Sequence, residues 1–317
     1  MNIVVLDGKT LNPGDLSWAE LESLGSCVFY DRTQESEVLQ RIGDAEIVLT
    51  NKTPISAEII RQTAKLKYIG VLATGYNVVA TSAAKEANIV VTNIPAYSTA
   101  AVAQLTFALL LEVCHHVGEH SRAVHAGEWT RSEDFCFWNY PLIELYGKTM
   151  GIIGLGQNGK AVAKIAEAFG MNVLVYTRTL HPVQSRTLKF VTLDTLLTDS
   201  DVISLNCPLT PETSGIINKG SLAKMKRSAI LINTGRGGLI NEQDLREALD
   251  NSIISYAAVD VVSQEPMTAD NPLLGAKNII ITPHLAWATY ESRARLMDIA
   301  VNNVRCFLEN SPINVVE

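Results

Sequence analysis

The amino-acid sequence predicts an α/β protein of two lobes with parallel sheets, in which one lobe is inserted into the other. Short runs of β-branched and aromatic residues alternate with helical patterns along both halves of the chain. This alternation is typical of βαβ units and a parallel sheet. A chain of 317 residues has room for roughly two domains.

The first half of the chain contains a series of predicted strands separated by helical patterns. The helical patterns include Glu35–Ile42 and Ala57–Ala64. Strands and helices in this order predict one parallel sheet. The strands are expected at Ile3–Leu6, Cys27–Tyr30, Ile47–Thr50, Tyr68–Leu72 and Ile89–Thr92.

The second half repeats this rhythm more strongly. Its strands are expected at Met150–Ile153, Val173–Tyr176, Val202–Leu205, Ala229–Asn233, Ala257–Asp260 and Ile279–Ile281. Six parallel strands in two mononucleotide-binding halves is the count of a Rossmann fold. We therefore expect two Rossmann-like or flavodoxin-like lobes.

Two long helical patterns lie at the junctions between the two sets of strands. One runs from about Thr99 to Ala126 and the other from about Trp287 to Glu309. We interpret them as the crossings between the lobes, with the last helix packing on the first lobe. The discontinuous lobe is then expected over residues 1–98 and 286–317, and the inserted lobe over residues 99–285.

Composition and charge exclude several classes of partner. Hydrophobic residues make up 47% of the chain and charged residues 19%, which is typical of a globular protein with ample core. A net charge of −7 argues against a nucleic acid partner. The longest apolar stretch, Ala100–Val113, is interrupted by Gln104 and is too short to span a bilayer. The N-terminus lacks the basic region of a signal peptide, so we expect a cytoplasmic protein with no membrane partner.

The cysteines and histidines do not predict a metal site. The cysteines are odd in number and scattered, so they form neither a disulfide framework nor a metal spacing. They are Cys27, Cys114, Cys136, Cys207 and Cys306. Four histidines crowd one helical region without the pattern of acids and an open coordination position that a metal site requires, and we interpret them as polar-face or interface residues. These are His115, His116, His120 and His125.

A glycine-rich turn follows the first strand of the inserted lobe. Its glycines, Gly154, Gly156 and Gly159, match the G-x-G-x-x-G pattern, and a helical pattern follows directly. The first glycine permits the tight turn, the second the close approach of a pyrophosphate, and the third the packing of helix on strand. The N-terminus of that helix favours the phosphates. The inserted lobe is therefore expected to bind a dinucleotide, and the discontinuous lobe to hold the substrate.

The second strand of this lobe predicts which dinucleotide binds. An NAD site normally has Asp or Glu about 20 residues after the glycines, but no acid occurs between Met171 and Leu193. The strand is followed instead by Thr177, Arg178 and Thr179. A guanidinium with hydroxyl neighbours would pair with a 2′-phosphate. NADP(H) is therefore the expected cofactor; alternatively, Arg178 is a solvated surface residue and NAD(H) also serves.

Three residues late in the chain form a candidate catalytic group. Arg236, Glu265 and His284 each follow a predicted strand, and ligands bind at the carboxyl ends of the strands in such sheets. A guanidinium can hold a substrate carboxylate, an imidazolium can donate a proton to a carbonyl oxygen, and a carboxylate can orient the imidazole. These types suit reduction of a 2-keto acid. The alternatives are a capping arginine, a loop charge and a packed core histidine.

Over essentially its whole length the chain resembles the D-isomer-specific 2-hydroxyacid dehydrogenase family. The motifs that carry the resemblance are Val71–Asn77, Gly154–Gly159, Asn233–Gly238, Ala257–Pro266 and Pro283–His284. The resemblance implies that Arg236, Glu265 and His284 are catalytic, with His284 as the proton donor. It also implies that Ala73, Thr74 and Gly75 offer backbone N–H groups to the substrate carboxylate.

The resemblance implies further cofactor contacts in the inserted lobe. Asp260 would bond the nicotinamide carboxamide. The other implied contacts are Gln157, Asn158, Cys207, Pro208, Thr213, Thr234, Gly235 and Arg236.

Two segments, Asp7–Trp18 and Phe135–Leu145, are similar to the glycerate dehydrogenase (hydroxypyruvate reductase) subgroup. The implied reaction reduces hydroxypyruvate to D-glycerate with NAD(P)H, with glyoxylate, which would give glycolate, as a poorer substrate. One alternative is another substrate, such as D-lactate or 4-phosphoerythronate. A second alternative is a non-catalytic nucleotide sensor that resembles the transcriptional co-repressors of the family.

The stretch Glu128–Leu145 is rich in aromatic residues, too many to leave exposed on a monomer. The family resemblance implies a homodimer through this region. We further hypothesise that Trp138 reaches the substrate pocket of the partner; the alternative is plain dimer packing.

Overall fold

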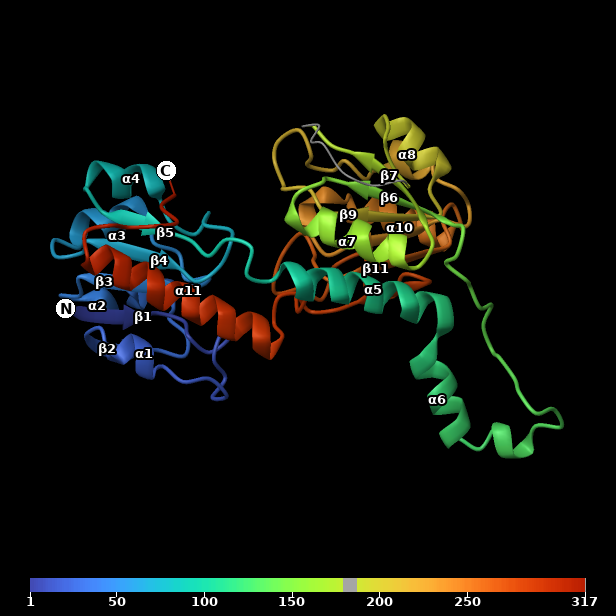
Figure 1. Ribbon diagram of the computed structural model, residues 1–317, viewed down its shortest axis with the longest axis horizontal. Helices are drawn as coiled ribbons and strands as arrows, with labels where there is room; N and C mark the ends of the chain where they lie inside the picture. The colour runs from blue at the N-terminus through green and yellow to red at the C-terminus, as the bar shows by residue number, and fades with distance from the viewer. Residues whose placement is uncertain (179–186, 317) are drawn as a thin grey trace. The chain divides into compact units, whose positions relative to one another are not determined.

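The computed structural model describes residues 1–178 and 187–316 (Figure 1). The chain forms two compact units. The first comprises Met1–Ser98 and Ala288–Glu317, and the second comprises Thr99–Trp287. Each unit contains one sheet in which all paired strands are parallel.

The sheet of the first unit contains every strand predicted there, in the order β2-β1-β3-β4-β5. The strands are β1 (Asn2–Val5), β2 (Ser26–Phe29), β3 (Ile47–Thr50), β4 (Tyr68–Val71) and β5 (Val90–Thr92). All residues of the central strands β3 and β4 are buried, whereas exposure alternates along the edge strand β2. This difference is expected, because the middle of a parallel sheet is covered on both faces.

Short helices and one long helix cover this sheet. The short ones are α1 (Ala19–Glu22), the 3₁₀ helix η1 (Glu35–Glu37), α2 (Val38–Ile42), α3 (Ala57–Gln62) and α4 (Thr81–Glu86). The long helix α11 (Tyr290–Leu308) comes from the end of the chain and packs on β4 (Figure 1). Phe307 of α11 contacts the ring of Tyr68 at 4.8 Å between centroids. Helix α11, near the end of the chain, therefore forms part of the core of the first unit.

An ion pair joins the same two parts of the chain. Arg293 of α11 is nearly buried and binds both carboxylate oxygens of Asp15, at 2.8 and 2.6 Å. The hydrogen bond with Arg293 lowers the pKa of Asp15. Arg293 also donates to the carbonyl oxygen of Leu11 at 2.9 Å.

The sheet of the second unit has the order β12-β11-β10-β9-β6-β7-β8. Its strands are β6 (Thr149–Ile153), β7 (Asn172–Tyr176), β8 (Leu188–Phe190), β9 (Val202–Leu205), β10 (Ile230–Asn233), β11 (Tyr256–Val259) and β12 (Ile279–Ile281). All six predicted strands are present, and β8 is an addition at the edge. It was missed because only Leu188 of its three residues is partly buried, so the sequence shows no apolar run. The strand order reverses direction between β6 and β9, which is where such sheets bind ligands.

Helices cover both faces of this sheet. On one face, α5 (Thr99–His115) packs against α7 (Gln157–Ala168), and Phe107 stacks on Phe169 at 5.4 Å. The other face is covered by α8 (Leu193–Asp199), α9 (Lys219–Leu222) and α10 (Glu242–Asp250). Neighbouring residues of β6 enter opposite cores, Ile152 with α5 and α7 and Ile153 with α8 to α10, as strand alternation requires.

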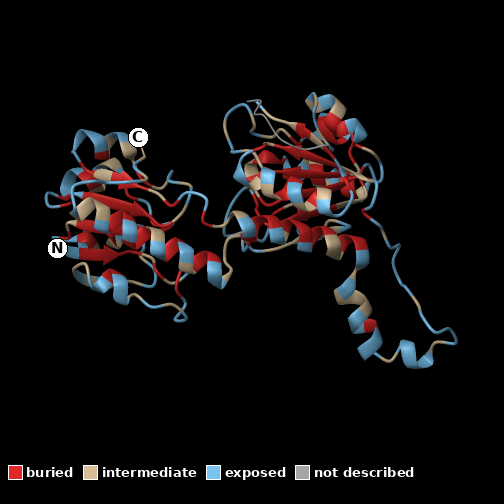
Figure 2. Ribbon diagram, in the orientation of Figure 1, coloured by how far each residue is buried: buried red, intermediate tan, exposed pale blue. Residues whose placement is uncertain are grey.

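The prediction of one long helix from Thr99 to Ala126 is wrong, because the helix is broken at His116. The structure has α5 and a separate α6 (Val117–His125), bent by 53°. His116 adopts a left-handed conformation with φ 47° and ψ 45°, which a continuous helix excludes. The periodic pattern does not reveal one such residue. Figure 1 shows α6 leading away from the rest of its unit, and Figure 2 shows that this segment is largely exposed.

We call residues 117–144 the arm. It contains α6, the 3₁₀ helix η2 (Trp129–Arg131) and the irregular segment that returns to β6. Within the described part of the chain, no single helix is long and apolar enough to cross a membrane. The bent pair α5 and α6, taken together, has the length and composition of a span.

Candidate active site

The glycine-rich turn joins β6 to α7 and has the geometry of a phosphate cradle. Gly154 has φ +95°, and a Cβ there would lie 2.7 Å from the backbone of Cys207. A Cβ on Gly159 would lie 2.1 Å from the carbonyl oxygen of Gly154, so the helix packs closely on the turn. In contrast, no atom lies within 4 Å of the position that a Cβ on Gly156 would take. The turn is therefore closed on the protein side and open where a pyrophosphate would approach.

The helix behind this turn suits an anion. Gln157 and Asn158 begin α7, a helix of 12 residues, and the first N–H groups of a helix, with the positive end of its dipole, favour an anion. These residues fit a dinucleotide phosphate.

Neighbouring strand ends form the rest of a rim around the turn. Cys207 and Pro208 follow β9, and burial raises the pKa of the Cys207 thiol, which keeps it neutral. Thr213 donates to the carbonyl oxygen of Pro208 at 2.7 Å. After β10, the hydroxyl of Thr234 meets that of Thr106 at 3.0 Å. The predicted contacts on β9 and β10 thus share one edge of the sheet with the glycine turn.

The residues expected to select the cofactor follow β7. Thr177 and Arg178 come directly after its last residue, and Arg178 is exposed. A hydrogen bond with Thr210 and, more weakly, the positive charge of Arg178 lower the pKa of Glu212. Arg178 thus influences a carboxylate in the segment after β9. Thr179, the third predicted residue, lies outside the described residues.

His284 and Glu265 form a direct pair on the same rim. Glu265 lies in the segment after β11 and His284 in the segment after β12, and their Nδ1 and Oε2 atoms are 2.6 Å apart. Their side chains are 27% and 35% exposed, so the pair is reachable from solvent. With Nδ1 engaged by the carboxylate, Nε2 is the nitrogen that can act on another molecule.

A buried carboxylate holds the segment that carries His284. Asp260 is 1% exposed and accepts hydrogen bonds from the hydroxyl of Thr282 at 2.6 Å and from the N–H groups of Leu285 and Ala286 at 2.9 Å. The N–H of His284 donates to the carbonyl oxygen of Asp260 at 2.7 Å. This positioning role could not be predicted from the sequence, because contacts between a strand end and residues 282–286 leave no local pattern. The expected contact of Asp260 with a nicotinamide carboxamide stays a prediction.

Arg236 follows β10, the strand next to β11. Its Nη1 donates to the carbonyl oxygen of Gly235 at 2.8 Å, and its side chain is exposed. Strands β10, β11 and β12 are neighbours, so Arg236, Glu265 and His284 leave adjacent strands at the same edge. The described residues contain no group of three or more His, Cys, Asp or Glu side chains that could hold a metal ion.

The predicted carboxylate-binding loop belongs to the other unit, after β4. Ala73 and Thr74 are fixed to the end of β5 by hydrogen bonds, with the hydroxyl of Thr74 donating to the carbonyl oxygen of Ile94 at 2.8 Å. The N–H groups of Thr74 and Gly75 have no acceptor among the residues that the structure describes. Such exposed N–H groups are suited to an anion.

A carboxylate that follows β1 has a positioning role that was not predicted from the sequence. Asp7 accepts hydrogen bonds from the N–H groups of Asn51 at 2.7 Å, Lys52 at 2.5 Å and Thr53 at 2.9 Å. It thereby fixes the loop after β3, the strand beside β4. An acid at the end of the first strand is the signal in the sequence.

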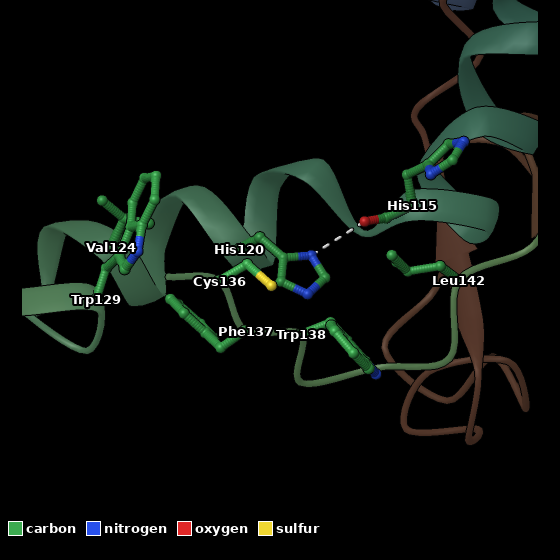
Figure 3. Close-up of a pocket in the computed structure, with 8 residues that line it drawn as sticks. All are labelled: His115, His120, Val124, Trp129, Cys136, Phe137, Trp138 and Leu142. Carbon is green, nitrogen blue, oxygen red and sulfur yellow. Dashed lines mark hydrogen bonds between the residues drawn. The ribbon is translucent and has the colours of Figure 1, made fainter. Parts of the chain in front are cut away.

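A pocket lies away from the rim, on the arm and the end of α5 (Figure 3). Its volume is about 250 Å³. It is lined by His115, His120, Val124, Trp129, Cys136, Phe137, Trp138 and Leu142. The Nδ1 atom of His120 lies 3.0 Å from the carbonyl oxygen of His115, and its Nε2 accepts from the N–H of Asn139 at 3.1 Å. None of the predicted catalytic residues lines this pocket, so we assign the chemistry to the rim.

Comparisons with known proteins agree with this geometry. Residues 107–286 match the family described as D-isomer specific 2-hydroxyacid dehydrogenase, NAD binding domain. A hydroxypyruvate reductase from Blautia hydrogenotrophica is 58% identical over 100% of this chain and 99% of its own length. A glycerate dehydrogenase from Methylorubrum extorquens is 44% identical over 89% of this chain and 88% of its own.

The fold is also that of solved relatives. An acyclic imino acid reductase, solved in complex with NADPH and D-Arg, has a TM-score of 0.87 and 32% identity, and the match covers 100% of both chains. The expected family and fold class are thus confirmed. The chain belongs to the D-isomer specific 2-hydroxyacid dehydrogenase family and is an oxidoreductase of that family.

Proposed function

We propose that this chain reduces hydroxypyruvate to D-glycerate with NAD(P)H, with glyoxylate, reduced to glycolate, as a second substrate. The observation that carries the proposal is the His284–Glu265 pair at 2.6 Å on the rim that also holds Arg236 and the glycine turn. The relatives named hydroxypyruvate reductase and glycerate dehydrogenase support this choice of substrate.

Each residue of the rim has a definite role in the proposed reaction. The glycine turn and the segments after β7, β9 and β10 would hold a nicotinamide dinucleotide, which would supply the hydride for the carbonyl carbon. Arg236 binds the substrate carboxylate through two parallel hydrogen bonds and fixes its orientation. His284 donates the proton on Nε2 to the carbonyl oxygen, and Glu265 holds Nδ1–H and stabilises the imidazolium before transfer. The keto acid, NAD(P)H and one proton thereby give the hydroxy acid and NAD(P)⁺.

We propose that the two units divide the binding. The unit Thr99–Trp287 holds the dinucleotide through the glycine turn and the segments after β7, β9 and β10. The unit Met1–Ser98 with Ala288–Glu317 binds an anionic group of the substrate through Ala73, Thr74 and Gly75. The N–H groups of Thr74 and Gly75, which have no acceptor in the described part of the chain, support this role.

We propose NADP(H) as the preferred cofactor, with NAD(H) as the weaker one. Two features support this preference. The segment after β7 offers Thr177 and an exposed Arg178 in place of an acid, and a guanidinium pairs with a 2′-phosphate. A solved relative at 32% identity was captured with NADPH.

We propose a homodimer formed through the arm. Phe135 is 90% exposed and Trp138 is 63% exposed, and Figure 3 shows Trp138 at the side of an open pocket lined by other aromatic rings. Apolar rings gathered in this way are typical of an interface. A second copy of the chain is the proposed occupant, and Trp138 is proposed to reach the substrate pocket of that copy.

A panel of 2-keto acids at fixed NADPH, repeated with NADH, tests the proposed function. We expect hydroxypyruvate to give the highest kcat/KM, glyoxylate a lower one, and pyruvate and 2-keto acids with larger side chains the lowest. Arg236→Gln should abolish turnover. A protein that binds NADPH but turns over no keto acid would instead be a nucleotide sensor, and a higher kcat/KM for another acid would change the substrate.

A further inference from the structure

A buried carboxylate lies at the start of α10, outside the proposed catalytic group. Glu242, the first residue of that helix, is 9% exposed. It accepts hydrogen bonds from the N–H of Ser263 at 2.6 Å, from the hydroxyl of Ser263 at 2.8 Å and from Nδ2 of Asn271 at 3.0 Å. A buried carboxylate is costly without such donors. Glu242 is therefore bound to one segment, the loop after β11.

That loop carries Glu265. The N–H of Val262, the residue before Ser263, donates to Oε1 of Glu265 at 3.2 Å. The other oxygen, Oε2, lies 2.6 Å from Nδ1 of His284. A continuous series of contacts thus runs from Glu242 through the Val262–Ser263 segment to Glu265 and the imidazole.

Gly237, which comes earlier in the chain, also packs on the Val262–Ser263 segment. A Cβ on Gly237 would lie 1.9 Å from the carbonyl carbon of Val262 and 2.4 Å from the nitrogen of Ser263. The backbone next to Arg236 therefore packs directly on the peptide bond between Val262 and Ser263. The N–H of this peptide, that of Ser263, donates to Glu242, so packing against Gly237 and the hydrogen bond to Glu242 both hold the peptide.

A carboxylate, rather than an amide, is needed at position 242. Oδ1 of Asn271 accepts from the N–H of Leu273 at 2.9 Å, so Nδ2 of Asn271 must face residue 242 as a donor. The N–H of Ser263 is also a donor. A glutamine has one acceptor oxygen and would place an NH₂ group against one of these donors.

We propose that Glu242 is a positioning residue for the reaction: it holds Ser263, and with it the adjoining Val262, whose N–H binds Glu265 and orients that carboxylate towards His284. This proposal depends on the roles proposed above for Glu265 and His284. Glu242 would touch neither substrate nor cofactor, and its effect is proposed to pass through Glu265; an effect through Gly237 and Arg236 would persist when Glu265 is replaced.

A double-mutant cycle tests this dependence. Glu242→Ala should lower kcat for hydroxypyruvate reduction by about 100-fold, because small misplacements of a catalytic group have effects of this size. It should leave the dissociation constant of NADPH unchanged. In a Glu265→Gln background, where the carboxylate to be oriented is already gone, the same substitution should have no further effect on the residual turnover. An equal loss in both backgrounds, or no loss in either, would overturn the proposal.

Two variants support the cycle. Glu247→Ala is the matched control, because Glu247 lies on the same helix, is 48% exposed and binds Gln243 of that helix and Lys219; it should leave kcat unchanged. Should Glu242→Ala unfold, Ser263→Ala removes one of the hydrogen bonds from the side of the loop. It should give a smaller loss that again depends on Glu265.

Histidine side-chain NMR gives a readout that needs no turnover. The chain has six histidines, and His284→Gln assigns the relevant signal. Glu242→Ala should shift the His284 signal and leave the others in place, and an unmoved His284 signal would contradict the proposal. Failure of the proposed function is seen separately, as wild-type turnover that His284→Gln does not reduce.

Discussion

The rim at the strand ends and the arm are opposite kinds of surface within the same unit. On the rim, the carboxylates of Asp260 and Glu242 are buried, and each accepts three hydrogen bonds from the neighbouring loop. On the arm, Phe135 and Trp138 expose most of their surface. On the rim, the buried carboxylates have hydrogen-bond partners within the unit, so the loops that carry the proposed catalytic residues are preorganised for chemistry. The arm instead exposes apolar surface that another chain would cover. The following predictions test this contrast, from the largest expected effect to the smallest.

Among the substitutions that compare the rim with the arm, removing the proton donor should have the largest effect. His284→Gln should lower kcat about 10³-fold, because a positioned general acid contributes about 10²–10⁴-fold. The KM for hydroxypyruvate should change little, since Arg236 is intact. Steady-state kinetics with NADPH measure both parameters. His125→Gln on the arm is the control and should behave as wild type; a loss of similar size in the control would remove the distinction between the two surfaces.

Replacing Asp260, the carboxylate that binds the segment around His284, should lower both activity and stability. Asp260→Asn replaces an acceptor of three hydrogen bonds. We expect the free energy of unfolding to fall by about 2 kcal/mol, since hydrogen bonds to charged groups contribute this much, and kcat to fall about 100-fold. Urea denaturation and steady-state kinetics measure the two. If the variant loses NADPH binding but keeps the stability of wild type, Asp260 contacts the nicotinamide as predicted and does not hold the His284 loop.

The arm should control assembly rather than folding. Trp138→Ala should weaken the dimer at least about tenfold, because a buried interface tryptophan typically contributes about 2 kcal/mol or more. Sedimentation analysis over a range of concentrations measures this, and Ile253→Ala, an exposed apolar residue outside the arm, is the control. If wild type is a monomer at all concentrations, the proposed dimer is wrong. If the variant remains a dimer with unchanged substrate preference, Trp138 does not reach the pocket of the partner.

The cofactor preference should depend on Arg178. Arg178→Gln should lower kcat/KM for NADPH about tenfold, the effect of losing roughly one charge-assisted hydrogen bond, and leave that for NADH nearly unchanged. Arg227→Gln, before β10 and at the opposite end of the sheet, is the control. A wild-type preference for NADH would contradict the proposal, and Arg178 would then be a surface residue.

The smallest effect is expected for the ion pair that joins the two parts of the first unit. The pKa of Asp15 is lowered in the folded protein, so its contribution to stability is present above the unfolded value of about 3.9. That contribution is lost as the pH falls through the lower, folded value. Asp15→Asn should therefore lower Tm at pH 6 but not at strongly acidic pH. Asp31→Asn, in a more exposed and longer ion pair with Lys9, should change Tm less; equal effects at both pH values would exclude the pair as the cause.

Much of the fold could be predicted from the sequence because buried strands have distinct apolar runs. β3, β4, β9 and β10 are buried at every residue, and their runs stand out. β8 escaped prediction because an edge strand buries little, and the break at His116 because one left-handed residue leaves the helical pattern intact.

The candidate site shows the same division. The positions of Arg236, Glu265 and His284 after strands were readable, since strand ends meet at one edge. The residues that hold them, Asp260 and Glu242, bind loops up to 29 positions away in sequence, and such contacts leave no local pattern. Asp7 is comparable, because it reaches residues 51–53 across the sheet.

The most direct test of the central claim is the stoichiometry and stereochemistry of hydroxypyruvate reduction by the purified protein. Chiral chromatography of the product, with NADPH oxidation followed by absorbance, gives both. We predict one D-glycerate for each NADPH oxidised, and about 10³-fold less product from His284→Gln over the same period. Formation of L-glycerate, or NADPH binding without any glycerate, would contradict the assignment of the rim as the active site of a D-specific reductase.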